Sequence, residues 1–194
     1  MVVQAAAAIL AGGHARRFGG RDKSRLIVER HPIINRQVNV LQRVARTVFI
    51  VAADASRFAD IGLPVYADLV EGAGALGGVY SALEVSTEDC VLVVACDLPF
   101  LDAGLLGRLA DLAKDSDAAW VRSARGPEPL LACYRRSARH AIRREIDAGR
   151  LKAGDLASVL RIAEMDLTEV ARFGPPARLL ANVNTPDDYD RIKG

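Results

Sequence analysis

Short, uninterrupted runs of apolar residues recur along the chain and are separated by segments with helical periodicity. Each run is continuous and does not alternate between apolar and polar residues, which is typical of strands buried on both faces of a sheet. The runs cover residues 2–10, 48–53, 91–95, 119–121, 130–134 and 179–183. We therefore expect a buried strand at each of these positions.

Between the runs, apolar residues spaced three and four positions apart predict helices. The clearest apolar face lies within residues 34–45, and a second lies within residues 105–112. Residues that favour the first turn of a helix precede several of these segments. We expect helices to start near Pro32, Val79, Asp102, Ser137 and Thr185.

Strands and helices that alternate in this way favour an α/β fold of three layers around a mostly parallel central sheet. No internal repeat, low-complexity tract or long linker divides the chain, so we expect residues 1–194 to form a single domain. Ligands of such sheets bind beyond the carboxyl ends of the strands. The residues that follow each apolar run are therefore the candidates for function.

Composition narrows the possible partners. The 194 residues are 51% hydrophobic and 26% charged, which is near the average of globular domains and excludes extensive disorder. The net charge of +2 is too small for a surface that tracks nucleic acid or an anionic membrane. Positive charge is concentrated locally, with five basic and one acidic residue in 14–25 and seven and two in 135–152. We expect an anionic partner to be small or locally bound.

Cysteine and histidine contribute little to the candidate chemistry. The three cysteines include no CxxC pair, so neither a disulfide framework nor a zinc site is predicted, and a cytoplasmic protein is expected. No apolar stretch approaches the ~20 residues that span a bilayer, so no membrane contact is expected. The three histidines have no metal-ligand spacing and pair with no serine or cysteine nucleophile, which argues against a hydrolase triad.

A glycine-rich loop follows the first apolar run. Residues 10–23 read LAGGHARRFGGRDK. Four glycines let backbone amides approach an anion closely, and three arginines and Lys23 supply positive charge. The spacing is neither GxGxxG nor that of a P-loop, which argues against a dinucleotide dehydrogenase and a P-loop NTPase. We predict a phosphate-binding loop. The alternative is a glycine-containing turn whose basic side chains are simply exposed to solvent.

An aspartate follows the third run. Asp97 comes two residues after the stretch 91–95, where a carboxylate can hold Mg²⁺ against a substrate phosphate. Its alternative use is an Asx turn before Pro99. Cys96, beside it, is interpreted as a small core residue.

Three further polar segments are candidates for ligand contact. Asp68 precedes the glycine-rich segment 72–78, which suits either a nucleotide contact or a flexible helix entry. Residues 125–130 have the turn chemistry of a loop that could cover a site. Residues 182–186 offer the side-chain amides of Asn182 and Asn184, which both donate and accept hydrogen bonds.

Five motifs carry a resemblance to a known family. They are LAGG-x-ARRFGG-x-DK, DLVEGAGALGG, CDLPF, GPEPLLACY and NVNTPDDY. In this order, over residues 10–188, they resemble the molybdenum cofactor guanylyltransferase family of MobA-like nucleotidyltransferases. The resemblance implies a Rossmann-like nucleotidyltransferase fold. It also implies transfer of GMP from GTP to the terminal phosphate of Mo-molybdopterin, with release of pyrophosphate.

The resemblance further implies which residues form the site. Lys23 would contact the nucleotide phosphates and Asp97 would bind both the nucleotide and Mg²⁺, so these two are the predicted catalytic residues. The remaining predicted binding residues are Leu10, Ala11, Gly12, Gly13 and Asp68 for GTP, and Asn182 and Asn184 near the pterin substrate.

The chain departs from the family pattern at two places. Asp54 stands where relatives commonly have asparagine, and Ala75 replaces the proline of a Gly-Pro-Leu sequence. The choice of GTP over CTP follows from the resemblance alone. A cytidylyltransferase acting on molybdopterin or another phosphorylated acceptor therefore stays open, as does a non-catalytic nucleotide- or pterin-binding accessory protein.

A second basic segment has two interpretations. Arg136, Arg139 and Arg143 are expected on the outer face of their helix. There they could steer the anionic acceptor or make transient contact with a molybdopterin-handling protein, although a solvated helix face is the simpler interpretation.

Overall fold

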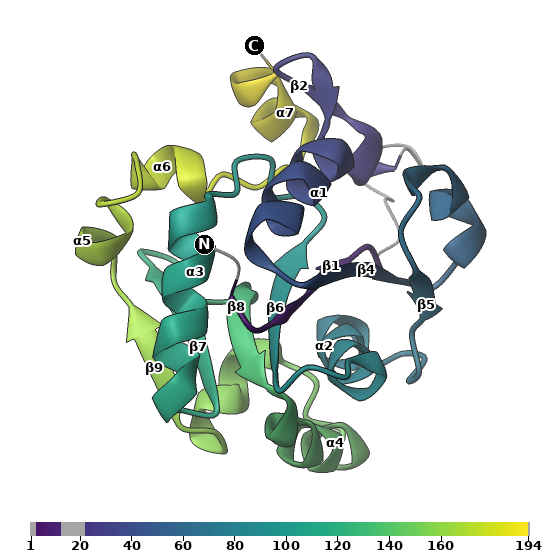
Figure 1. Cartoon of the computed structure of the whole chain (residues 1–194), viewed down its shortest axis with the longest axis vertical. Coiled ribbons are helices and arrows are strands. Elements are labelled where there is room, and N and C mark those ends of the chain that lie inside the picture. Colours follow the sequence, from purple (N-terminus) through teal and green to yellow (C-terminus); the bar gives the residue numbers. More distant parts are fainter. Residues whose placement is uncertain (1–2, 13–21, 194) are drawn as a thin grey trace.

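A seven-stranded sheet forms the centre of the molecule (Figure 1). In the computed structural model, which describes residues 3–12 and 22–193, its strands follow the order β5-β4-β1-β6-β8-β7-β9. Their bounds are β1 Ala6–Leu10, β4 Thr47–Ala52, β5 Val65–Ala67, β6 Cys90–Ala95, β7 Ala118–Ser123, β8 Gly126–Arg135 and β9 Ile162–Met165. A separate hairpin pairs β2 (Ile27–Val28) with β3 (His31–Pro32).

The sheet is mostly parallel, as expected. β1 pairs in parallel with β4 on one side and with β6 on the other, and β5 and β9 also pair in parallel with their neighbours. β8 is the antiparallel strand of the described sheet, because it pairs antiparallel with both β6 and β7. The chain leaves β1 in one direction and β6 in the other, so the carboxyl ends of these two strands form a topological switch point.

Helices cover both faces of the sheet, which gives the expected three layers (Figure 1). One core cluster packs α1 (Ile33–Val44) and α3 (Ala103–Leu112) on one face. A second cluster packs α2 (Gly74–Val85) and α4 (Arg139–Asp147) on the other. Successive residues of β1 alternate between the clusters, with Ala7 and Ile9 in the first and Ala6, Ala8 and Leu10 in the second. Both faces need apolar residues, which explains the continuous runs.

Five of the six predicted strands are confirmed and one is wrong. Residues 179–183 form no strand: α6 (Pro176–Leu179) ends there, with Pro176 in its first turn. Proline at that position favours a helix start, and Leu179 and Val183 bury their side chains in core clusters without joining the sheet. The two edge strands are not among the predicted strands: β5 has three residues and β9 has four, and neither contains an apolar run long enough to stand out in the sequence.

Two predicted helix caps are confirmed. The side chain of Asp102 accepts a hydrogen bond from Leu105 N at 2.9 Å and begins α3. Thr185 and Asp188 form a reciprocal capping box at the start of α7 (Pro186–Ile192). This last helix packs beside the β2–β3 hairpin (Figure 1), where the Tyr189 hydroxyl donates to Ile27 O at 2.9 Å.

Two predicted helix starts are displaced. Ser137 does not cap a helix, because it lies inside the 3₁₀ turn η5 (Arg136–Ala138), which runs directly into α4. The helix expected from Val79 starts five residues earlier, at Gly74. Two of the glycines that suggested a loop, Gly77 and Gly78, are buried residues of this helix.

The arginines of the second basic segment hold α4 against α2. Arg136 Nε donates to Leu83 O at 3.2 Å, and Arg139 Nε lies 3.5 Å from Glu84 Oε1. The Arg143 guanidinium stands 5.7 Å from the centre of the Tyr80 ring. Intramolecular contacts therefore bind all three side chains, and of the three Arg143 is also exposed to solvent, as the solvated-face interpretation expects. None of the described helices is long and apolar enough to cross a membrane.

Candidate active site

The carboxyl ends of β1 and β6 bring two predicted motifs into contact. Cys96 N donates to Leu10 O at 3.1 Å, and Ala11 N donates to Val51 O at 2.8 Å at the end of β4. The predicted nucleotide residues Leu10, Ala11 and Gly12 thus lie at the switch point, beside the turn that carries Asp97. Gly13 and the arginines at positions 16, 17 and 21 lie outside the described residues.

Three predicted site residues, far apart in the sequence, meet at this point. Lys23 Nζ donates to Asn184 Oδ1 at 3.0 Å and lies 3.9 Å from Asp97 Oδ2. The side chains of Lys23 and Asp97 are each 20% exposed. The backbone connects the same segments, because Val183 N donates to Asp97 O at 3.0 Å. A cation, a carboxylate and an amide therefore share one partly buried location.

Burial and the neighbouring Lys23 charge shift the pKa of Asp97 in opposite directions. The pKa of its carboxyl is raised, chiefly because burial disfavours the carboxylate, while the nearby Lys23 ammonium lowers it and the Glu128 carboxylate raises it further. Burial likewise raises the pKa of the adjacent Cys96 thiol to about 12. Cys96 is thus protonated at neutral pH and is no nucleophile, in agreement with its interpretation as a core residue.

A buried glutamine of α1 supports the turn at Asp97. Gln37 is 1% exposed, and its Nε2 donates to Ala95 O at 2.7 Å and to Leu98 O at 2.9 Å. Both partners are carbonyl oxygens, so the amide nitrogen must face them, and Oε1 has no partner among the described residues. Gln37 therefore fixes the backbone on both sides of Asp97. The sequence gives no signal for this role.

A cavity of about 270 Å³ opens beside Asp97, on the β8 side of the sheet. Its polar lining residues are Asp97, Glu128 and Asn182, and the rest of the wall is apolar or glycine. Those remaining residues are Ala75, Ala95, Leu98, Pro129, Leu130, Leu131, Ala153, Gly154 and Leu180. The cavity brings Asn182 to the same side of the site as Asp97.

An irregularity in β8 shapes this wall. Val121 faces Glu128 whereas its neighbour Trp120 faces Ala132, so three residues of β8 are left over between the two pairs. The Tyr134 hydroxyl, in a fully buried side chain, donates to Pro129 O at 2.9 Å and fixes the displaced segment. Bulges of this kind redirect side chains next to active sites. The prediction of a covering loop at residues 125–130 is therefore wrong. The segment forms a tight turn followed by the bulged start of β8.

Asp68 organises its own loop. Its Oδ1 accepts hydrogen bonds from the Ser81 hydroxyl at 2.8 Å and from Val70 N at 3.1 Å. Gly77 is closely packed here, because a Cβ would lie 3.0 Å from Val70 O and 3.2 Å from Asp68 Oδ1, so a side chain would force its neighbours to shift. The neighbouring Gly78 faces Leu10 in the same way. The glycine-rich segment thus packs α2 closely against both the Asp68 loop and the end of β1.

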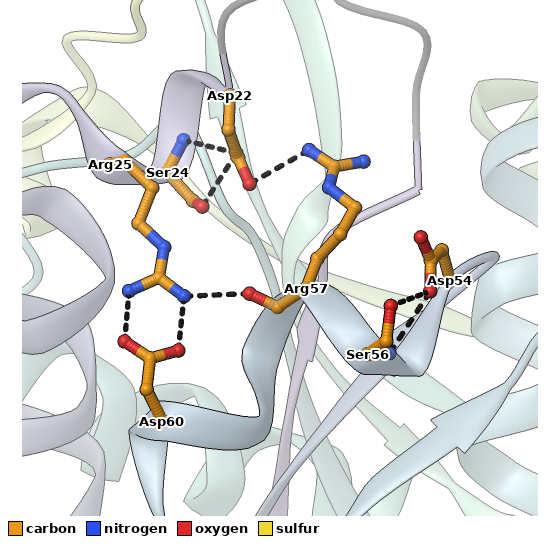
Figure 2. Close-up of polar contacts among 7 residues, drawn as sticks. All are labelled: Asp22, Ser24, Arg25, Asp54, Ser56, Arg57 and Asp60. Atoms are coloured by element: carbon orange, nitrogen blue, oxygen red, sulfur yellow. Dashed lines mark hydrogen bonds and ion pairs between the residues drawn. The ribbon is translucent and has the colours of Figure 1, made fainter.

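A polar network joins the segments that follow β1 and β4 (Figure 2). It links η2 (Lys23–Arg25) to η3 (Ala55–Ile61) through Asp22, Arg25, Arg57 and Asp60. Asp54 stands at the start of η3, where its Oδ1 accepts from Ser56 N at 3.0 Å and Ser56 Oγ at 2.6 Å. Aspartate and asparagine both serve well at such a cap, so the departure from the family pattern at Asp54 is conservative in structure.

A mostly parallel sheet, with a lysine of η2 and the aspartate that follows β6 brought together at its switch point, is typical of a nucleotide-binding protein of Rossmann-like fold. The chain belongs to the MobA-like NTP transferase family, because the model of that domain matches residues 7–165. It is accordingly an enzyme of the nucleotidyltransferase class, as the resemblance implied.

Individual relatives agree with this assignment. A protein named probable molybdenum cofactor guanylyltransferase, from Chloroflexus aggregans, is 38% identical over 191 residues, covering 95% of this chain and 91% of the relative. The crystal structure of molybdopterin-guanine dinucleotide biosynthesis protein A from Archaeoglobus fulgidus superposes with a TM-score of 0.83 at 25% identity, covering 97% and 96% of the chains. A manganese complex of Rv0371C from Mycobacterium tuberculosis shares the fold, with a TM-score of 0.68 at 16% identity over 98% of each chain.

Proposed function

We propose that this protein transfers GMP from GTP to the terminal phosphate of Mo-molybdopterin, giving molybdopterin guanine dinucleotide and pyrophosphate. The names of its full-length relatives support this choice of substrates over CTP. The observation that carries the proposal is the meeting of Lys23, Asp97 and Asn184 at the switch point, beside a cavity that can take a second substrate.

In this proposal the nucleotide lies over the carboxyl ends of β1 and β4. The backbone of Leu10, Ala11 and Gly12 lines GTP, and Lys23 binds its phosphates. Gly13 is a further GTP-binding residue that the family resemblance implies. A lysine ammonium is a compact point charge suited to phosphate oxygens. Asp68 contacts GTP from the loop that it orders through Ser81.

The donor set fits a Mg²⁺ ion shared between protein and substrate. Asp97 supplies a carboxylate at the strand end, and no group of three or more His, Cys, Asp or Glu that would enclose a metal occurs among the described residues. Mg²⁺ typically uses one or two carboxylates together with water and substrate phosphates. When bound, it neutralises charge on the phosphate oxygens. Asp97 would be the protein ligand that holds it.

The reaction joins two polyanions. A phosphate oxygen of the acceptor attacks the α-phosphorus of GTP, the bond between the α-phosphorus and the bridging oxygen breaks, and pyrophosphate leaves with that oxygen. The attacking phosphate needs no general base, because the second pKa of a phosphomonoester is about 6. The protein's task is therefore to position and neutralise charge, and Lys23 performs both at the nucleotide phosphates.

The acceptor occupies the cavity beside Asp97. Its apolar walls suit a flat heterocycle, and Asn182 lines the cavity, where it can bind the pterin substrate. Asn184, from the same C-terminal segment, would bind the pterin from its position beside Lys23. In this arrangement Asp97 stands between the two substrates, where the phosphates react. We place the enzyme in the cytoplasm, with transient contact to molybdopterin-handling proteins and no nucleic-acid partner, and residues 1–194 as a single domain.

The decisive experiment follows product formation. Purified protein, Mo-molybdopterin, GTP and Mg²⁺ should release pyrophosphate and yield the guanine dinucleotide, with CTP and ATP run in parallel. Release with CTP in place of GTP would identify a cytidylyltransferase. Binding of GTP in a thermal-shift assay without any pyrophosphate release would identify a non-catalytic accessory protein. Either result would refute the proposal.

A further inference from the structure

Asp22 and Arg25, which flank Lys23 in the sequence, both contact η3. No recognised motif lies in η3. Asp22 Oδ2 lies 2.7 Å from Arg57 Nη2. On the other side, Arg25 donates to both carboxylate oxygens of Asp60, at 2.7 and 2.5 Å, and to Arg57 O at 2.7 Å. Figure 2 shows the two contacts side by side. We call Asp22, Arg25, Arg57 and Asp60 the η3 clamp.

The clamp rests on the hydrophobic core. Phe58 is fully buried, and the guanidinium carbons of Arg25 and Arg57 each lie 5.7 Å from its ring centre. Both arginines thus gain a cation–π contact as well as an ion pair. The Asp60 carboxylate raises the pKa of Arg25, and Arg25 lowers the pKa of Asp60, as a direct hydrogen-bonded pair requires. Because η3 cannot shift without moving Phe58, it gives η2 a rigid support.

The segment that carries Lys23 needs such a support. η2 has three residues, and short 3₁₀ segments have little intrinsic stability. Within it, Asp22 Oδ1 accepts from Ser24 N at 3.0 Å and from Ser24 Oγ at 2.7 Å, so one carboxylate both caps η2 and binds Arg57. The side chain of lysine is long and flexible, so the region that its ammonium can reach depends on where the backbone is held.

We propose that Arg57 and Asp60 are positioning residues that hold the backbone of Lys23 so that its ammonium stays beside Asp97 and Asn184, ready for nucleotide phosphates. The inference rests on the function proposed above for Lys23. It differs from a structural role in a measurable way. Exposed ion pairs contribute little to folding, whereas a pre-positioned cation increases affinity by removing the ordering step from binding. Loss of the clamp should therefore change nucleotide affinity far more than thermal stability.

The test measures the dissociation constant of GTP with Mg²⁺ by calorimetry for wild type, Asp60→Asn and Arg57→Gln. We expect each variant to weaken binding about 3- to 10-fold, with the melting temperature within a degree or so of wild type. Asp111→Asn, which breaks the exposed Lys114–Asp111 pair remote from the site, is the matched control and should leave affinity unchanged. The difference between wild type and the two variants should shrink at high salt, because exposed charges are screened.

A double-mutant cycle that combines each clamp variant with Lys23→Ala decides whether the clamp acts through the lysine. In the Lys23→Ala background, Asp60→Asn and Arg57→Gln should have no further effect on GTP affinity. An additive loss from Arg57→Gln alone would show that Arg57 contacts phosphate directly, and an additive loss from both would show an independent role, so either result overturns the positioning role. Unchanged affinity in all clamp variants also overturns it.

Failure of the proposed function is separately visible. A wild type that binds CTP and not GTP refutes guanylyl transfer, and the same cycle measured with CTP still tests the clamp, because the phosphates are common to both nucleotides. If the wild type binds no nucleotide and no inorganic tripolyphosphate, Lys23 has no phosphate to bind and both proposals fail.

Discussion

The two sides of Asp97 differ in the kind of residues that form them. Towards β4, charged side chains dominate: Lys23 is carried on a segment held by the η3 clamp, and arginine–aspartate pairs connect the loops. Towards β8, the cavity is largely apolar, and its shape comes from a strand bulge fixed by the buried Tyr134 hydroxyl. One side is organised by ion pairs at the surface, and the other by packing.

This difference corresponds to the two proposed substrates. A triphosphate is recognised by positive charge whose position must be fixed, and carboxylates that bind neighbouring arginines provide that. A flat pterin is recognised by shape and a few polar contacts, which apolar walls and asparagines provide. Asp97 belongs to both sides, so substitutions should divide into those that affect both substrates and those that affect one.

The largest effect is expected at Asp97, where the two sides meet. Asp97→Asn keeps the size of the side chain but removes the charge that would hold Mg²⁺. We expect turnover to fall about 10²-fold or more, measured as pyrophosphate release at saturating GTP and acceptor. Near wild-type turnover with Mg²⁺ would remove Asp97 from the catalytic role.

The same variant should be more stable than wild type when metal and nucleotide are absent. Because burial raises the pKa of Asp97 in the folded state, the folded protein disfavours the carboxylate. This lowers the free energy of unfolding. The loss is absent below the ordinary aspartate pKa of about 4 and develops as the pH rises through the raised pKa of the folded state. Asp97→Asn should thus raise the melting temperature at neutral pH, with the gain vanishing at acid pH. A lower melting temperature at neutral pH would mean that the pair with Lys23 outweighs burial.

The next largest effect is expected from a substitution on the charged side of Asp97 alone. Lys23→Ala removes the ammonium that lies beside Asp97 and Asn184, and GTP binding should weaken about 10- to 100-fold, as expected for a lost charged hydrogen bond. Calorimetric titration with GTP measures this, and Lys114→Ala is the exposed control. Affinity for the pterin acceptor should stay close to that of wild type. Unchanged GTP affinity would exclude Lys23 from phosphate binding.

A smaller effect is expected where α2 packs against the nucleotide side. In Gly77→Ala the added Cβ meets Val70 O and Asp68 Oδ1, which should cost about 1–3 kcal/mol of unfolding free energy and weaken GTP binding by displacing the Asp68 loop. Gly107 in α3 is the matched control, because a Cβ there meets no atom within 4 Å. Gly107→Ala should be neutral or stabilising by up to about 1 kcal/mol. Urea unfolding of both variants measures the contrast, and equal stabilities would contradict it.

Much of the fold can be predicted from the sequence because β1 and β6 are covered on both faces. Their continuous apolar runs follow directly from that burial. The edge strand β9 has no such requirement: Glu164 within it is exposed, and the strand shows no periodic signal. The error at residues 179–183 has the opposite origin, because apolar residues there serve a helix end and a loop.

The site divides in a similar way. Lys23, Asp97 and Asn184 occur in motifs at strand ends or before a helix, and the switch point brings them together. Gln37 and the clamp residues Arg57 and Asp60 act through partners about 30 to 60 residues away. The sequence around Gln37 predicts a helix and nothing more, and no sequence pattern singles out Arg57 and Asp60. Positions that fix a motif from a distance therefore emerge only from the three-dimensional contacts.

The smallest predicted effect isolates the apolar side. Tyr134→Phe removes the hydroxyl that holds Pro129 O and leaves the ring in place, so unfolding free energy should fall by about 1 kcal/mol. The displaced segment of β8 would then relax, and the KM for the pterin acceptor should rise a few-fold while GTP affinity stays unchanged. Tyr66→Phe on the exposed edge strand β5 is the control. A parallel change in GTP affinity would show that the two sides of Asp97 are mechanically coupled through the sheet. That outcome would replace the division between an ionic side and a packed side with a single site that responds as a unit.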